Sequence, residues 1–262
     1  MVRIGLVLSG GAFKGLAHVG VLKVLEENNI CVDAIAGCSM GAIIGAFYAA
    51  GRTPKEIEEF VVKQNFRSVL NFSLKSFSKL GIQDLSKMRR LIEGFTGVRR
   101  FNELRIPLYI NATNITKEKE VVFSKGELFR AIRASISIPG IFAPLRIGGD
   151  YYVDGGVLNN IPVSILPKNI KKYIISDAIS YDKLDASKGI SIRDIVEKSI
   201  LLMMYRITES KLRGIPRKDY VLIQPRLSRE YALPRESKFR QIIKQGEIAA
   251  QKKILEIKRK IR

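Results

Sequence analysis

The chain opens with two short apolar runs, each of which passes through a glycine-containing turn into a helical pattern. Ile4–Leu8 is continuously apolar, as is typical of a strand buried on both faces of a parallel sheet, and it ends at Ser9-Gly10-Gly11. Helical spacing follows over Gly15–Glu27, and the second run, Ala34–Gly37, leads into the helical pattern of Met40–Ala50. Two strands joined through a helix are typical of the right-handed crossover unit, so the sequence predicts an α/β sandwich.

The rest of the chain continues this mixture, without internal repeats or linker-like segments. Further strands are predicted over Leu108–Ile115, Glu120–Phe123, Tyr151–Val153, Tyr173–Ile179 and Tyr220–Ile223, and further helices from Thr53-Pro54, over Glu127–Ile136 and over Ile192–Leu212. Residues 64–100 are less regular and mix Phe with basic side chains, so we predict a variable, basic cap there. With 262 residues, 46% of them hydrophobic, we expect one domain over 1–262.

The charge is strongly positive. The 45 Lys and Arg residues outnumber the 25 Asp and Glu residues, which leaves a net charge of +20 and favours anionic partners such as acidic membranes or nucleic acid. The start is too short and too soon interrupted for a signal sequence, and no run of about 20 apolar residues could span a bilayer. We therefore expect a cytoplasmic protein with peripheral membrane contact at most, in which Cys31 and Cys38 are reduced thiols.

The C-terminal segment, about 235–262, carries ten Lys or Arg against three acids. Its apolar residues recur at helical spacing, at Ile243, Ala250, Ile254, Ile257 and Ile261. The pattern predicts a basic amphipathic helix, either an outer helix that packs its isoleucine stripe on the sheet or a helix that lies on a membrane surface.

The strongest chemical signal is Gly37-Cys38-Ser39-Met40-Gly41, which fits G-x-S-x-G at the junction of a buried strand and a helix. In such an elbow the serine projects from a sharp turn. The positions two before and two after it must lack side chains so that strand and helix can approach, and Gly37 and Gly41 meet that need. We interpret Ser39 as a nucleophile.

A serine hydroxyl needs a neighbouring base. The single histidine, His18, precedes Ser39, whereas the usual hydrolase order places histidine last, so the ordinary triad is excluded and His18 is interpreted as structural. A carboxylate must then serve. Asp154, in Val153-Asp154-Gly155-Gly156 at the end of a predicted strand, is the candidate, although a tight Asp-Gly turn explains the motif equally well.

The loop Gly10–Gly15 runs into a helix N-terminus and can therefore offer backbone N–H groups to an oxyanion. A phosphate cradle is the competing interpretation. The Walker A pattern requires Lys after the last glycine, where Leu16 stands, and the dinucleotide fingerprint fails because Ala12 occupies its middle glycine.

Three segments, Leu8–Gly15, Gly37–Gly41 and Asp154–Gly156, resemble in order and context the motifs of patatin-like phospholipases, as do Ala131–Phe142 and the stretch up to Pro162. The resemblance, to the bacterial and archaeal members, covers roughly residues 4–180. It implies a patatin-like three-layer α/β/α sandwich, a Ser39–Asp154 dyad without metal or other cofactor, and an oxyanion hole formed by the backbone of Gly10, Gly11 and Ala12.

The loop departs from the usual family sequence at Ala12 and matches it at Lys14. Ala12 replaces a glycine usual in the family; its N–H remains a donor unless the position requires positive φ. Lys14, beside Gly15, matches the basic residue usual there, and it either supports the loop, meets a phosphate or is simply solvated.

The leading hypothesis is a serine lipid acyl-hydrolase of the phospholipase A or lysophospholipase type that works on an anionic membrane surface. Alternatives are a carboxylesterase or thioesterase for soluble acyl compounds and a non-catalytic, lipid-binding regulatory protein. The sequence contains no nucleic-acid recognition motif, so no such partner is expected, and it predicts no oligomeric state.

Overall fold

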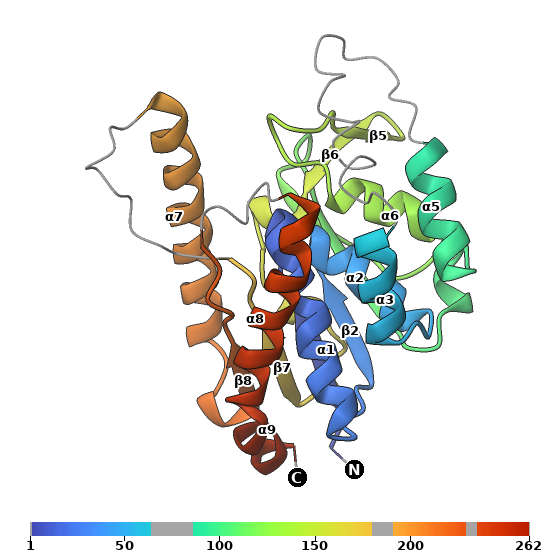
Figure 1. Ribbon diagram of the computed structural model, residues 1–262. Coiled ribbons are helices and arrows are strands. Elements are labelled where there is room, and N and C mark those ends of the chain that lie inside the picture. Colours follow the sequence, from blue (N-terminus) through green and yellow to red (C-terminus); the bar gives the residue numbers. More distant parts are fainter. Residues whose placement is uncertain (1, 64–85, 180–190, 229–234, 262) are drawn as a thin grey trace.

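The computed structural model describes residues 2–63, 86–179, 191–228 and 235–261 (Figure 1). Most of the segment 64–100, predicted to form a basic cap, lies outside the described residues. From residue 86 on, this segment forms helix α5 (Ser86–Thr96), which buries Met88 and Ile92 in the core.

A mixed, mainly parallel sheet forms the centre of the protein. Its strands are β1 (Ile4–Leu8), β2 (Ala34–Gly37), β3 (Leu108–Asn114), β4 (Lys119–Phe123), β5 (Leu145–Ile147), β6 (Asp150–Asp154), β7 (Lys172–Ser176) and β8 (Tyr220–Ile223). The parallel part has the order β3-β2-β1-β7-β8; β4 and β6 pair with β3 in the antiparallel sense, and β5 extends the sheet beyond β6. The predicted α/β fold with a mainly parallel sheet is confirmed.

The central strand β1 is buried on both faces, as its unbroken apolar run predicts. Leu6 and Leu8 pack into the larger hydrophobic cluster, whereas Val7 points to the opposite face and packs into a second, smaller cluster. None of the three side chains is exposed to solvent. The glycine-rich loop is therefore attached to a strand that is packed on both faces.

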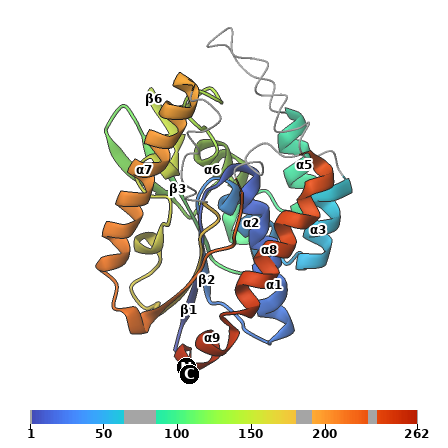
Figure 2. The same ribbon diagram turned by 60° about the vertical axis from the view of Figure 1, so that its left-hand side comes forward.

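Helices cover both faces of the sheet and so complete the three layers. They are α1 (Ala17–Glu27), α2 (Met40–Ala49), α3 (Pro54–Lys63), α6 (Leu128–Ser135), α7 (Ile192–Arg213), α8 (Phe239–Gln251) and α9 (Ile254–Lys260). Figures 1 and 2 show α1, α2, α3 and α8 on one side of the sheet and α7 on the other. Leu212, near the end of α7, packs against the smaller cluster.

The basic C-terminal segment folds as α8 and α9, with its isoleucine stripe inside the protein. α8 lies against α1 so closely that a Cβ at Gly20 would be 2.0 Å from the Ile243 carbonyl oxygen, and one at Gly246 would be 1.9 Å from that of Ala17. The buried stripe comprises Ile243, Ala250, Ile254 and Ile257. Because it packs against neighbouring helices and the sheet, this stripe is not available to a membrane.

Two predicted boundaries shift next to the glycine-rich loop. The helix predicted from Gly15 begins as an α-helix at Ala17, because Ala12–Leu16 forms a 3-10 turn. The strand predicted over Tyr173–Ile179 ends at Ser176. Beyond it the chain bends so that the Ala178 N–H donates to Ser9 Oγ at 2.8 Å, which fastens the start of the loop.

Candidate active site

Ser39 forms the turn between β2 and α2, with the strained backbone of a nucleophile elbow. Its φ of 53° and ψ of −121° lie in a region that non-glycine residues rarely adopt, at a cost of about 1–3 kcal/mol. The Ser39 N–H donates to Ser135 Oγ on α6 at 2.8 Å, so this peptide is held in place and its N–H is already engaged. The side chain is only 4% exposed.

The two elbow glycines are required by close backbone approach. A Cβ at Gly37 would lie 2.6 Å from the Gly41 carbonyl oxygen, and a Cβ at Gly41 would lie 2.3 Å from the carbonyl oxygen of Leu8. Both distances are shorter than a contact between a Cβ atom and a carbonyl oxygen allows. As expected for an elbow, the strand and the helix can approach each other only because these two positions lack side chains.

Asp154 ends β6, which the antiparallel pairing with β3 carries to the same end of the sheet as Ser39. Its Oδ1 accepts a hydrogen bond from the Gly156 N–H at 2.8 Å and lies 3.7 Å from Cys38 Sγ. The Ser39 side chain lies close enough to this carboxyl to lower its pKa. The tight turn and the serine contact occur together, so the two interpretations of the Asp-Gly motif are not exclusive.

The environment of Asp154 makes it a stronger base than an ordinary aspartate. Burial raises its pKa from 3.8 to about 6, and the hydrogen bonds from Ser39, Gly156 and Cys38 offset only part of this shift. Burial and the neighbouring carboxylate raise the pKa of the Cys38 thiol well above its usual value, so the thiol remains a donor. Near neutral pH, Asp154 is mostly ionised yet basic enough to take a proton.

His18 is a buried structural residue away from this chemistry. Its Nε2 lies 2.9 Å from the Ser9 carbonyl oxygen, which can only accept, so Nε2 carries the proton and Nδ1 accepts from Ser176 Oγ at 2.8 Å. Burial lowers the pKa of His18 to about 4, which keeps the ring neutral. The ring ties the end of β1 to β7.

The glycine-rich loop passes directly beside Ser39. A Cβ at Gly10 would be 3.2 Å from the Cβ of Ser39, and Gly11 has a φ of 155°. Ala12 has a φ of 48°, so this position does require the left-handed region that favours glycine. Alanine adopts it at a cost of about 1–2 kcal/mol and keeps its N–H.

Lys14 and Gly15 close the loop against α2. A Cβ at Gly15 would be 2.6 Å from the Cβ of Met40, so the loop packs on the residue that follows the candidate nucleophile. Lys14 is only 8% exposed, which contradicts the interpretation of a solvated side chain.

An amide network supports the Asp154 turn from behind, and sequence reasoning missed it. Asn111 Nδ2 donates to Glu120 Oε1 at 3.0 Å and to the Asn159 carbonyl at 2.8 Å, while Asn159 Nδ2 donates to the same Glu120 oxygen at 2.7 Å. Asn111 and Glu120 sit on the neighbouring strands β3 and β4, whereas Asn159 reaches them from 48 and 39 positions further along the chain, so the network has no local signal.

The Asn160 amide was also missed. The side chain is 2% exposed, and within the described residues neither its Oδ1 nor its Nδ2 has a hydrogen-bond partner. Its Oδ1 would lie 2.6 Å from a Cβ at Gly10 and 3.2 Å from one at Gly156. The amide thus fills the gap between the glycine-rich loop and the Asp154 turn, with polar atoms that a bound molecule could satisfy.

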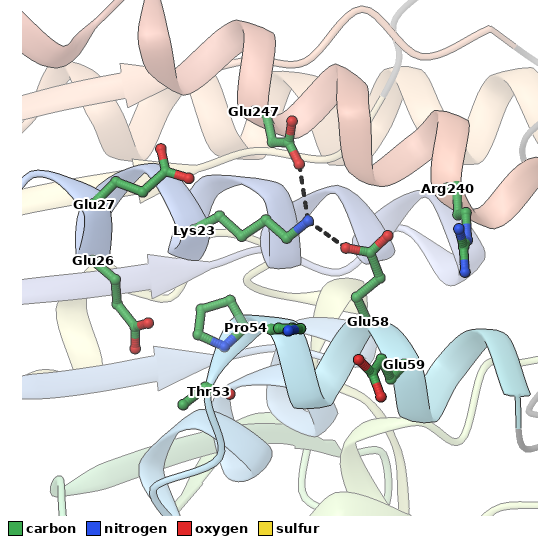
Figure 3. A pocket seen from close by; sticks show the side chains of 10 residues that line it. Lys23, Glu26, Glu27, Thr53, Pro54, Glu58, Glu59, Arg240 and Glu247 are labelled. Atoms are coloured by element: carbon green, nitrogen blue, oxygen red, sulfur yellow. Dashed lines mark hydrogen bonds and ion pairs between the residues drawn. The ribbon is translucent and has the colours of Figure 1, made fainter.

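A surface hollow where α1, α3 and α8 meet lies apart from these residues. Figure 3 shows Lys23 at its centre, bonded to Glu58 and Glu247. The three side chains come from three different helices, so the ion pairs join the layer that covers one face of the sheet. The hollow includes none of the residues that surround Ser39.

Comparison with known proteins agrees with this arrangement. The family model described as patatin-like phospholipase matches residues 6–167, which include the loop, the elbow and the Asp154 turn. The chain belongs to the patatin-like phospholipase family. The resemblance predicted from the three motifs is thereby confirmed.

Relatives in sequence are longer proteins. An NTE family protein of Mycobacterium tuberculosis is 36% identical over 162 residues, which cover 62% of this chain and 45% of that protein. A lysophospholipase of Cryptococcus neoformans is 33% identical over 189 residues, which cover 69% of this chain and 11% of that protein. The chain thus spans less than half of the length of either relative.

Two solved structures share the fold. VipD from Legionella pneumophila has a TM-score of 0.57 and 16% identity, over 96% of this chain and 66% of VipD. The type III effector ExoU has a TM-score of 0.55 and 16% identity, over 98% of this chain and 53% of ExoU. At this identity the likeness establishes the patatin-like architecture.

Proposed function

We propose that the protein is a serine lipid acyl-hydrolase of the phospholipase A or lysophospholipase type, in which Ser39 is the nucleophile and Asp154 its base. The observation that carries the proposal is the position of the Ser39 side chain beside a buried carboxyl whose pKa is raised to about 6. A carboxylate of ordinary pKa would be a weaker acceptor for a serine proton.

In the first step the Ser39 oxygen attacks the ester carbonyl while its proton passes to Asp154. The carbonyl oxygen becomes an oxyanion, which the N–H groups of Gly10, Gly11 and Ala12 would bind beside Ser39. When the carbon–oxygen bond breaks, the proton returns from Asp154 to the departing alcohol. An acyl group then remains on Ser39.

In the second step a water molecule attacks the acyl-enzyme and gives its proton to Asp154. The free fatty acid leaves, and the proton returns to the Ser39 oxygen. The Asn160 amide, which has no partner among the described residues, lies between the loop and the Asp154 turn, so it is suited to hold this water or the ester group in line. Neither step consumes a metal or an organic cofactor.

The net charge of +20 favours an anionic lipid surface as the place where the substrate is met. Within the described residues, no helix has both the length and the apolar character needed to cross a bilayer. We therefore propose peripheral attachment at the inner face of a membrane, with a cytoplasmic protein as its unbound form.

The test is fatty-acid release from mixed phosphatidylglycerol and phosphatidylcholine vesicles, followed by mass spectrometry, for the wild type, Ser39→Ala and Asp154→Asn. We expect release by the wild type and losses of about 10³-fold or more in both variants, since each would remove a group needed in every step. Near-normal turnover by Asp154→Asn would overturn the dyad. Hydrolysis of soluble esters alone would favour the esterase alternative.

A further inference from the structure

The first half of α7 carries the largest group of exposed apolar side chains in the described part of the chain. Six large apolar residues within twelve positions are between 48% and 82% exposed: Ile192, Ile195, Val196, Ile200, Leu202 and Met203. Apolar side chains grouped in this way normally have their face covered, and exposed apolar patches mark interaction surfaces.

These six residues share one side of the helix. At 3.6 residues per turn they fall within an arc of about 160°. The opposite side faces the protein: Thr208 is buried, and Met204 Cε would lie 3.1 Å from a Cβ at Gly156. The helix thus uses one side to cover the candidate site and presents an apolar side outward. We call the six exposed residues the α7 apolar face.

The α7 apolar face lies at the end of the molecule to which β6 brings Asp154. In Figures 1 and 2 the N-terminal half of α7 projects at the same end as β5 and β6, while α9 and both termini lie at the opposite end. Two further exposed apolar side chains belong to this end, Ile115 and Tyr151, whose backbones are hydrogen-bonded to each other at 2.9 Å.

We propose that the α7 apolar face inserts into the interface of an anionic phospholipid membrane and thereby holds the Ser39 site against its substrate. This inference rests on the proposed function. Its support is the position of the face beside the site, together with a net charge of +20 that draws the protein to anionic lipid. When the α7 apolar face is inserted, Met204, which follows Met203 in the helix, would lie between the membrane and the Asp154 turn.

The chain contains no tryptophan, so a single introduced indole can report its own environment. The reporter variant is Met203→Trp, and its matched control is Leu255→Trp on α9, where the native leucine is 80% exposed at the opposite end of the molecule. Both are made in a Ser39→Ala background, so the readout does not depend on catalysis. The probe is vesicles of phosphatidylglycerol and phosphatidylcholine, with and without bromine on the acyl chains.

We expect a blue shift and quenching by brominated lipid for Met203→Trp, and neither for Leu255→Trp. Binding without quenching at position 203, or equal quenching at both positions, would overturn the proposal. Association of two copies through this face, detected by light scattering and abolished by Leu202→Glu, would also overturn it, because the occupant would then be a second chain.

A second measurement separates this inference from the proposed function. Ile195→Glu combined with Leu202→Glu is expected to weaken vesicle binding by about tenfold or more, since transferring even one such side chain from water is worth at least that factor. Leu255→Glu should bind as the wild type does. A soluble short-chain ester reports on the Ser39 site in the same preparations. If the wild type hydrolysed the ester but did not bind vesicles, the membrane role of the α7 apolar face would be overturned while the proposed hydrolase activity would stand.

Discussion

Replacing Asp154 by Asn is expected to stabilise the protein while removing its activity. The carboxyl has a pKa of about 6 in the folded protein against an ordinary 3.8, so above pH 6 folding must bury a charge that water solvates better. The difference between these values corresponds to about 3 kcal/mol. Asparagine has the same shape, carries no charge, and can still accept the Gly156 N–H.

The pH dependence of this gain identifies its cause. A group whose pKa is higher in the folded state contributes stability that is complete below pH 3.8 and is lost as the pH rises through about 6. The advantage of Asp154→Asn should therefore be near its full value, about 3 kcal/mol, at pH 7.5 and should fall to about 1 kcal/mol at pH 4.5.

Urea unfolding followed by circular dichroism measures both values. Asp150→Asn is a control on the same strand whose pKa shift has the opposite sign, because the hydrogen bond and charge of Lys117 lower the pKa of Asp150. That variant should not be more stable than the wild type at pH 7.5. If Asp154→Asn brought no gain at pH 7.5, or a gain that did not shrink at pH 4.5, the assigned burial cost would be wrong.

Three further outcomes follow from the site. The kcat/KM for a soluble ester should fall about tenfold from pH 7 to pH 5, as Asp154 with its pKa of about 6 becomes protonated; a flat profile would contradict the base assignment. Gly41→Ala should lower the stability by about 3 kcal/mol or prevent folding, because its Cβ would meet the Leu8 carbonyl at 2.3 Å. Gly94→Ala, whose Cβ would meet nothing within 4 Å, should raise the stability by about 0.5–1 kcal/mol. Similar thermal melts for the two variants would refute this. Ala12→Gly should raise stability by up to about 1 kcal/mol and preserve turnover, and a clear loss of stability in urea would show that φ is not positive there.

The elbow could be predicted from sequence because its physics is local. Gly37, Ser39 and Gly41 lie within five residues, and the close approach of Gly37 to the Gly41 carbonyl belongs to one strand-to-helix turn. The parallel sheet was equally readable, since β1 is apolar at every position and each apolar run leads into a helix.

The partners of the elbow could be predicted only by analogy, because long-range pairing positions them. Asp154 reaches Ser39 through the register of β6 on β3, and Ser135 holds the Ser39 N–H from α6. Asn160 has no sequence signal that separates it from Asn159, although the Asn159 amide nitrogen is bonded to Glu120 and, within the described residues, neither polar atom of the Asn160 amide has a partner.

The C-terminal segment illustrates a signal that was present but ambiguous. Its basic isoleucine pattern suits both a membrane surface and a buried interface, and the deciding feature is the pair Gly20 and Gly246, which lets α8 contact α1. In α7, apolar residues occur on all sides of the helix, so the sequence alone does not show which side faces outward. The outward apolar side became evident only from the burial of each residue.

The most direct test of the central claim is covalent trapping. The protein would be incubated with a fluorophosphonate, which phosphonylates activated serines, and then analysed by intact mass and peptide mapping. We predict one adduct per chain, located on Ser39, with none in Ser39→Ala and slow formation in Asp154→Asn. An unlabelled wild type, or an adduct at another serine that survives in Ser39→Ala, would contradict the assignment of Ser39 as the activated nucleophile.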